Sequence, residues 1–341
     1  MNAMVMSQAG SEEQAAPAFE KRNFLKLPVQ IDVDALLEDY RSIPRDAWAT
    51  SHWNIHCSAD MLLLRGGTKG TAEDFTTRQV SNKEILGRLP YISWLLSEDG
   101  PFGLPTYAFL FRMKPMGVAR PHHDNDPAWY DPVRIHVPIT TNDGAFLMAE
   151  KHVKHLAVGE VWTFDNQSFH SVVNGDGVRT HLIFDVLPNP KVNRLLEQAE
   201  WDPGIEDEER WARAFLPEAP PVLSPAAAEP LSVAEKVKLG LNPDGFASRV
   251  TKRNAVSRLT FAPIREGDVI ISVNGVDECA VARTAIDYIQ VRHKAGEAVA
   301  LDIIRNGEHR DLRLRLYRNP MPKGLRRARH MLLGLLRRRY E

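Results

Sequence analysis

The spacing of apolar and polar positions divides the chain into helical and β-rich stretches. Apolar residues recur at helical spacing over 33–43 and again over 82–96, which predicts two N-terminal helices that each bury one face. Beyond residue 107 the pattern changes to short apolar runs bounded by Gly, Pro, Asn or Asp. These runs predict strands at 107–113, 133–140, 145–149, 153–158, 160–164, 170–173 and 180–186. Short strands at such close spacing are typical of a sandwich or barrel.

A second compact unit follows a boundary rich in Pro and Ala. Acidic helical sequence at 192–199 and 206–215 leads into five prolines between 217 and 230, which predict a semi-stiff linker. Beyond it we expect strands at 269–273, 298–305 and 310–316, a helix near 281–291 and an Asn306-Gly307 hairpin turn. The predicted division is a flexible leader at 1–22, a mainly β barrel domain with flanking N-terminal helices at 23–190, a helical and Pro-rich linker at 191–232, a small α+β domain at 233–318 and a basic tail at 319–341.

Composition supports folded domains in a reducing compartment. Hydrophobic residues make up 43% of the 341 residues and charged residues 26%, so the chain can bury a core. Its two cysteines, Cys57 and Cys279, are too few for a disulfide framework or a multi-cysteine metal site, which favours a cytoplasmic protein. We expect no signal peptide at residues 1–24 and no membrane span, because no apolar run approaches 18 residues.

Charge is distributed unevenly along the chain. The net charge is −1, yet eight Lys or Arg residues and a single acid, Glu341, follow from Arg318 onward. A helical projection of 325–339 places most apolar side chains on one arc and most basic ones on the rest, which is typical of a helix lying on an anionic membrane surface. The alternatives are that this tail docks on the acidic body, for instance near 206–209, or is disordered. We expect no nucleic-acid partner, because the excess of positive charge is confined to the tail.

The segment Arg120-Pro-His-His-Asp124 concentrates side chains that bind metals. Alternate side chains of an extended chain share a face, so His122 and Asp124 point together and His123 points away. His170 opens another predicted strand further along the chain. Two histidines and one carboxylate on adjacent strands form the facial triad of non-haem Fe(II) sites, which leaves coordination positions open for a co-substrate and dioxygen. A lone His-x-Asp could equally lie in a surface loop, but the ordered set favours metal ligands at His122, Asp124 and His170.

Basic residues on two predicted strands indicate an anionic co-substrate. Arg179 immediately precedes the strand at 180–186, and its planar guanidinium matches a carboxylate bidentately, as the distal carboxylate of a 2-oxo diacid would require. Arg134 and His136 share one face of the strand at 133–140 and are candidates for further co-substrate or substrate contacts. For Arg134 the alternative is an ion pair with a neighbouring acid. His181 shares a face with Arg179 and either lines the pocket or packs in the core.

These motifs resemble the aspartyl/asparaginyl β-hydroxylase family of Fe(II)/2-oxoglutarate oxygenases. The likeness spans roughly residues 75–190 and is carried by Pro121-His122-x-Asp124, Arg134-Ile-His136, Gly159-Glu-Val-Trp162-x-Phe-Asp165, and Phe169-His170 with Arg179. It implies a double-stranded β-helix (a jelly-roll or cupin-like barrel), iron bound by the two histidines and Asp124, 2-oxoglutarate bound by Arg179, and co-substrate or substrate contacts from Arg134 and His136. Animal protein-hydroxylating members place Gly where this chain has Asp124, so the sequence is more similar to the bacterial branch that keeps all three ligands.

The second unit resembles a PDZ domain of the bacterial protease type. The likeness is carried by Leu239-Gly240-Leu241, Gly245-Phe-Ala-Ser-Arg-Val250, Ile264-Arg-Glu-Gly-Asp268-Val-Ile-Ile-Ser-Val-Asn-Gly275 and Leu301-Asp-Ile-Ile-Arg-Asn-Gly-Glu308, and the chain departs from the family over 251–263. The resemblance implies a PDZ-like domain in which the loop at 239–241 offers backbone N–H groups to a peptide C-terminal carboxylate while the peptide extends the sheet.

Together these features predict a 2-oxoglutarate-dependent dioxygenase that hydroxylates an unactivated C–H group. Fe(II), 2-oxoglutarate and dioxygen are the expected cofactor and co-substrates, with succinate and CO2 as co-products. The substrate is a small molecule such as an amino acid, a peptide or protein, or a lipid. The PDZ-like unit favours a peptide or protein, and the tail favours a peripheral membrane location. Two alternatives remain: a non-catalytic cupin-like scaffold whose PDZ-like unit binds peptide C-termini, and a metal enzyme that uses no 2-oxo acid.

Overall fold

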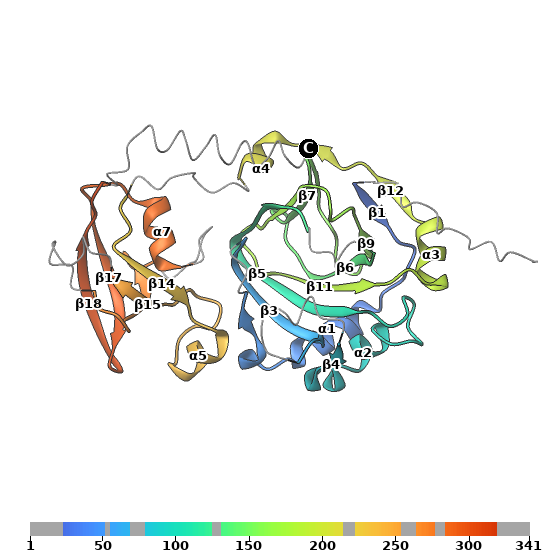
Figure 1. The fold of residues 1–341 in the computed structure, drawn as a ribbon, viewed down its shortest axis with the longest axis horizontal. Helices are drawn as coiled ribbons and strands as arrows, with labels where there is room; N and C mark the ends of the chain where they lie inside the picture. The colour runs from blue at the N-terminus through green and yellow to red at the C-terminus, as the bar shows by residue number, and fades with distance from the viewer. Residues whose placement is uncertain are drawn as a thin grey trace, which may run out of the picture.

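The chain folds into two units, each built on its own antiparallel sheet (Figure 1). We analyse a computed structural model, which describes residues 23–51, 55–68, 79–124, 131–213, 222–253, 264–276 and 284–318. The predicted leader at 1–22 and basic tail at 319–341 lie outside the described residues.

The first unit is a curled half-barrel, which confirms a mainly β fold. Its sheet runs in the order β12-β1-β9-β6-β11-β5-β10-β7-β8-β13, with β3 pairing with β5 and short strands β2 and β4 pairing with β3. The strands are β1 (Phe24–Lys26), β2 (Ala49–Thr50), β3 (His56–Gly66), β4 (Ser81–Asn82), β5 (Tyr107–His122), β6 (Val133–Thr140), β7 (Phe146–Ala149), β8 (His152–Lys154), β9 (Trp162–Thr163), β10 (His170–Val173), β11 (Arg179–Val186), β12 (Glu200–Asp202) and β13 (Ile205–Glu206).

Helices cover the outer face of this sheet, and the opposite face lines the half-barrel. The helical segments are α1 (Val33–Ser42), η1 (Arg45–Ala47), η3 (Glu84–Arg88), α2 (Pro90–Leu95), α3 (Pro190–Glu197) and α4 (Glu208–Arg213). Leu110 packs in the core that includes α1 and α2, whereas its neighbours Phe109 and Phe111 belong to the core inside the half-barrel. This alternation is the two-residue period of a strand that is covered on both faces. The single helix predicted over 82–96 is wrong, because β4, η3 and α2 divide that stretch and Pro90 starts α2.

The long strand β5 joins the two parts of the curled sheet. Its first half pairs with β11, from Tyr107 to Met113, and its last part pairs with β10, from Val118 to His122. Met116, with a positive φ of 57°, lies between these stretches. The end of β5 therefore lies beside the start of β10 at one end of the half-barrel.

The segment Glu200–Glu206 connects the two ends of the sheet. β12 pairs with β1 at one end of the strand order, and β13 pairs with β8 at the other. Only Pro203 and Gly204 separate these strands. Residues 200–206, which the sequence assigns to the linker, thus belong to the first sheet.

Replacing Gly204 by alanine is expected to lower the free energy of unfolding by roughly 2–4 kcal/mol. Gly204 has a φ of +73°, and a Cβ there would lie 2.8 Å from both Phe24 Cε2 and the Val153 carbonyl oxygen. The matched control is Gly240→Ala, where φ is +70° and no atom lies within 4 Å of the added carbon. Denaturant unfolding should therefore give a loss of about 1 kcal/mol for the control, and equal losses in the two variants would contradict the close approach.

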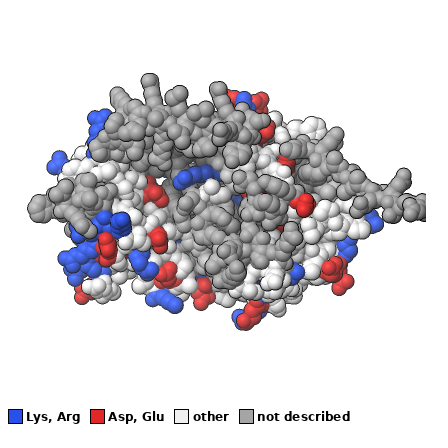
Figure 2. Space-filling model, in the orientation of Figure 1, with Lys and Arg blue, Asp and Glu red and all other residues white. Residues whose placement is uncertain are grey.

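The second unit is a five-stranded antiparallel sheet with a separate core. Its elements are β14 (Ala226–Pro230), α5 (Val233–Lys238), β15 (Ser248–Arg253), β16 (Val269–Val273), α7 (Ala285–Arg292), β17 (Ala298–Arg305) and β18 (Glu308–Arg315). The core packs α7 against the sheet, for instance Ile289 against Val250 and Leu301. Basic side chains gather over the β17–β18 side (Figure 2), where Arg310, Arg313 and Arg315 are exposed. Charges on this edge strand disfavour its pairing with another sheet.

The segment between β14 and β15 packs against the half-barrel. Thr50 Oγ1 donates to the Leu231 carbonyl at 2.8 Å, and Arg112 lies 3.5 Å from Asp244. Beneath this contact Asp60 is fully buried and accepts from Arg112 at 3.1 Å. Burial alone would raise the pKa of Asp60, but Lys114, Lys236 and Arg112 together hold it below its usual value. Charged residues of both units thus compensate one another across the contact.

Among the residues that the structure describes, none of the helices has the length and apolar character needed to span a bilayer.

Candidate metal centre

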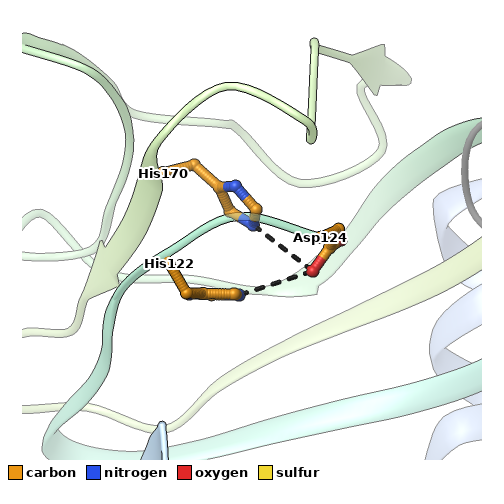
Figure 3. A group of neighbouring side chains, drawn as sticks. All are labelled: His122, Asp124 and His170. Carbon is orange, nitrogen blue, oxygen red and sulfur yellow. Dashed lines mark ion pairs between the residues drawn. The ribbon is translucent and has the colours of Figure 1, made fainter. Parts of the chain in front are cut away.

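Three side chains from two adjacent strands converge at the end of β5 (Figure 3). His122 and His170 are direct cross-strand partners, and Asp124 lies two residues beyond β5. Asp124 Oδ1 lies 3.6 Å from His122 Nε2 and 4.0 Å from His170 Nε2. One ligand atom from each of the three residues lies within 4.8 Å of the others.

A β-bulge turns His122 into the half-barrel. Val172 pairs with Ala119, and His170 pairs with His122. Between these two pairs β5 therefore contains one residue more than β10. An extra residue moves the next side chain to the other face of a strand. His122 consequently shares the inner face with Ala119, which packs in the core of the half-barrel.

Backbone carbonyls fix which nitrogen each histidine presents. His122 Nδ1 lies 2.6 Å from the Arg120 carbonyl, and His170 Nδ1 lies 2.9 Å from the Ser168 carbonyl. A carbonyl accepts only, so each Nδ1 carries the proton and each Nε2 keeps a lone pair. Both lone pairs are therefore available for a metal ion that Asp124 Oδ1 would also bind, as metal-binding histidines require.

The other oxygen of Asp124 is held by protein donors. Oδ2 accepts from Asn166 Nδ2 at 3.0 Å and from Arg134 Nη1, while the Asp124 N–H donates to the Asn166 carbonyl at 3.1 Å. Arg134 also binds both oxygens of Asp185, through Nε at 2.7 Å and Nη2 at 2.8 Å. Burial alone would raise the pKa of Asp124, but Arg134 and the two histidines lower it to about 2.

This donor set fits a divalent metal. At pH 7 Asp124 is an anion, and burial lowers the pKa of His170 to about 3 and that of His122 below its usual value, so both imidazoles are neutral ligands. Two neutral imidazoles and one carboxylate match the ligand preference of Fe(II), and among the described residues no cysteine joins this cluster. A metal bound here would require no proton to leave the ligands at neutral pH.

Three buried side chains that we call the anion pocket, Arg179, His136 and His181, adjoin the cluster. Arg179 opens β11, and its Nη2 lies 3.1 Å from His181 Nδ1. Arg179 Nη1, His181 Nε2 and both ring nitrogens of His136 are buried without a hydrogen-bond partner among the described residues. Burial lowers the pKa of Arg179 to about 9 and those of His136 and His181 well below 6.5. At pH 7 the pocket therefore holds one guanidinium and two neutral imidazoles, and unpaired buried donors of this kind favour an anionic ligand.

Phe164 separates these polar groups from the core. Its ring centroid lies 5.2 Å from that of His170 and 5.3 Å from that of His136. The ring is itself buried, and an apolar surface beside these groups strengthens electrostatic interactions inside the site.

The structure places every predicted site residue in this region. His122, Asp124 and His170 form the cluster, Arg179 and His136 lie in the pocket, and His123 is exposed and contacts the Gln167 carbonyl through Nδ1 at 2.8 Å. Arg134 lies between Asp124 and Asp185.

Two polar residues of the centre escape the sequence-based prediction. Asn166 donates to Asp124 of the cluster, and Asp185 accepts from Arg134 beside it. Asp185 could have been found from the sequence, because it is an acid within the apolar run 182–186. If that strand is buried, the acid needs a hydrogen-bonding or charged partner. Asn166 lies in a polar loop and gives no such signal.

The loop at 239–241 has no free N–H group for a peptide carboxylate. The N–H groups of Leu239, Gly240 and Leu241 all donate to carbonyls of α5, as is usual where a helix ends. These N–H groups are therefore paired within the described residues, and the carboxylate-binding role of this loop stays a prediction.

Metal-free protein is expected to lose stability as the pH falls from 7.5 to 5. The pKa of His170 is about 3 in the folded state against 6.5 when exposed, so the unfolded state binds more protons below pH 6.5. This one residue then costs about 2 kcal/mol at pH 5, and its contribution is fully restored above pH 6.5. Thermal melts in a chelator should show the decline, and His170→Gln should make it shallower, while the other buried histidines, whose pKa values are also lowered, keep part of it. An equally steep decline in that variant would contradict the assignment.

Comparison with known proteins gives a family model that matches part of the half-barrel. Residues 65–188 match the family model described as aspartyl/asparaginyl beta-hydroxylase. Among solved structures, an oxidoreductase of the 2OG-Fe(II) oxygenase family from Burkholderia pseudomallei matches at 13% identity and a TM-score of 0.36, covering 48% of this chain and 84% of that one. A Pseudomonas putida prolyl-4-hydroxylase matches at 15% identity and a TM-score of 0.31, and the match covers 49% of this chain and 94% of that one. The HtrA-type protease AlgW with a tripeptide matches at 15% identity and a TM-score of 0.25. The match covers 44% of this chain and 43% of that one, so this chain spans less than half of that protein.

Proposed function

We propose that the half-barrel is an Fe(II)- and 2-oxoglutarate-dependent dioxygenase that hydroxylates an unactivated C–H group. The observation that carries this proposal is the convergence of His122 Nε2, His170 Nε2 and Asp124 Oδ1 beside a buried Arg179 that no protein acid neutralises within the described residues. The family match at 65–188 includes all four residues.

Each residue has a separate task in this proposal. The two Nε2 atoms and Asp124 Oδ1 hold the metal, and the Arg179 guanidinium binds the distal carboxylate of 2-oxoglutarate with His136 and His181 beside it. Fe(II) and 2-oxoglutarate held by these residues would supply, with dioxygen, the oxidising power to hydroxylate a C–H group, with succinate and CO2 as co-products. Phe164 keeps this space dry.

For the substrate we propose a peptide or protein. The second unit, which we propose to be PDZ-like, would raise the local concentration of a bound polypeptide near the metal centre. We place the protein in the cytoplasm, with the basic tail on an anionic membrane surface.

The decisive experiment is succinate formation from 2-oxoglutarate by the full chain with Fe(II) and ascorbate. We expect steady uncoupled turnover without added substrate. His123→Ala is the matched control, because this exposed histidine lies between two proposed ligands and contacts the Gln167 carbonyl and the Phe169 ring; it should keep the wild-type rate. A flat trace with the wild-type protein would refute the proposal.

A binding protein is the second candidate, supported by the open end of the smaller sheet. β14 ends the strand order of the second unit, and Gln290 of α7 donates to the Val222 carbonyl just before β14 at 3.3 Å. An extended peptide could add to such an edge beside a helix. Flat succinate formation together with tight binding of C-terminal peptides would favour this scaffold. Turnover of another substrate that persists in Arg179→Ala would instead favour a metal enzyme without a 2-oxo acid.

A further inference from the structure

Arg134 binds carboxylates of the protein itself through every nitrogen of its guanidinium. Its Nε and Nη2 atoms bind the two oxygens of Asp185, and its Nη1 binds Asp124 Oδ2. All three guanidinium nitrogens thus contact acids of the protein itself, and Arg134 is largely buried. Arg179, by contrast, keeps one buried nitrogen without a partner in the described part of the chain.

The strand register brings Asp185 to Arg134. The two residues are direct partners between β6 and β11, and Asp185 is only 2% exposed. The Asp185 carbonyl also accepts from the Thr106 N–H at 2.7 Å, which fixes its backbone near the C-terminal end of β11. A bidentate pair between neighbouring strands leaves the guanidinium little freedom to rotate.

A fixed guanidinium sets the orientation of Asp124. Oδ2 is held by Arg134 and Asn166, so Oδ1 is the oxygen that faces both histidine Nε2 atoms. Resting on the proposed function, we infer that Arg134, held in turn by Asp185, is a positioning residue for the metal-binding carboxylate and is not a contact of the co-substrate. The three charged groups sum to −1, which a divalent cation offsets.

The experiment measures metal and 2-oxoglutarate binding separately. Co(II) serves as the probe in anaerobic titrations followed by its visible absorption, with no turnover required. In Asp185→Asn one acceptor oxygen becomes an amide donor that faces an Arg134 N–H. Partners that orient a metal ligand are worth about 10–100-fold in metal affinity. We expect a Co(II) dissociation constant raised by that factor and a changed Co(II) spectrum, while the 2-oxoglutarate affinity of the Co(II)-saturated protein stays within about 2-fold of wild type.

The second unit offers a matched control. Arg305 binds Asp268 in the same bidentate way, with both distances at 2.7 Å, and Asp268 is equally buried. Asp268→Asn therefore removes a comparable pair outside the centre and should leave Co(II) affinity unchanged. If Asp185→Asn fails to fold, Arg134→Lys provides the same test, because it keeps the charge and loses the fork.

The outcomes separate this inference from the proposed function. Wild-type Co(II) affinity in a folded Asp185→Asn or Arg134→Lys variant would overturn the inference, as would a loss confined to 2-oxoglutarate binding. Wild-type protein that binds Co(II) but forms no succinate would refute the proposed function alone.

Discussion

Asp124→Ala should abolish 2-oxoglutarate turnover and reduce Fe(II) affinity by more than the roughly 10–100-fold typical of losing an outer partner of a ligand. Asp124 supplies the only anionic ligand atom of the cluster, and its Oδ1 lies within 4.0 Å of both histidine Nε2 atoms. Without it two neutral imidazoles remain, and Arg134 Nη1 loses its partner beside the site. The expected result is no succinate above background and no saturable Fe(II) binding at micromolar metal.

Asp143→Ala is the control for this substitution. Asp143 lies in an exposed turn of the same half-barrel, so its replacement should leave turnover and metal affinity unchanged. Circular dichroism of both variants separates loss of the site from loss of the fold. Succinate formation by a folded Asp124→Ala variant at even a tenth of the wild-type rate would remove Asp124 from the proposed ligands.

Strands with simple patterns could be predicted from the sequence. The predicted bounds of 133–140, 170–173, 269–273 and 298–305 agree with β6, β10, β16 and β17. Each of these strands is bounded by turn-forming residues, so local sequence alone marks both ends.

Elements that depend on long-range pairing could not be predicted in the same way. β3 carries the apolar run 61–64 with buried Asp60 beside it, so it shows no alternation. The last part of β5 contains Pro115 and Pro121, which argue locally against a strand. Both segments are strands because β3 and β10 pair with β5, which no local pattern reveals.

The same distinction holds within the metal centre. Alternation placed His122 and Asp124 together because they are two residues apart, and the local pattern put His170 at a strand start. That His170 lies opposite His122 depends on the register of β10 against β5 and on the bulge between them. The pairing of Arg134 with Asp185 likewise follows from the register of β6 against β11. The sequence alone therefore could not decide whether Arg134 contacts a ligand or forms an ion pair with an acid of the protein.

Arg179→Met should weaken 2-oxoglutarate binding and stabilise the protein that lacks it. Losing a buried charged partner of a carboxylate costs about 2–5 kcal/mol, or roughly 30-fold to several thousand-fold in affinity. The pKa of Arg179, lowered to about 9 by burial, shows that the fold disfavours its charge. Because burial lowers the folded pKa of Arg179 below that of the unfolded chain, stability falls as the pH drops toward 9 and stays reduced at pH 7. An apolar side chain of similar length removes that penalty.

Two measurements test Arg179→Met against Arg310→Met, which replaces an exposed arginine on β18. Thermal melts without 2-oxoglutarate should give a higher Tm for Arg179→Met than for wild type, and no change for the control. Added 2-oxoglutarate with Co(II) should then raise the Tm of wild type and control but not that of Arg179→Met, since binding stabilises only a fold that holds the ligand. A lower ligand-free Tm with an undiminished 2-oxoglutarate response would show that Arg179 is a structural residue and that the co-substrate carboxylate binds elsewhere.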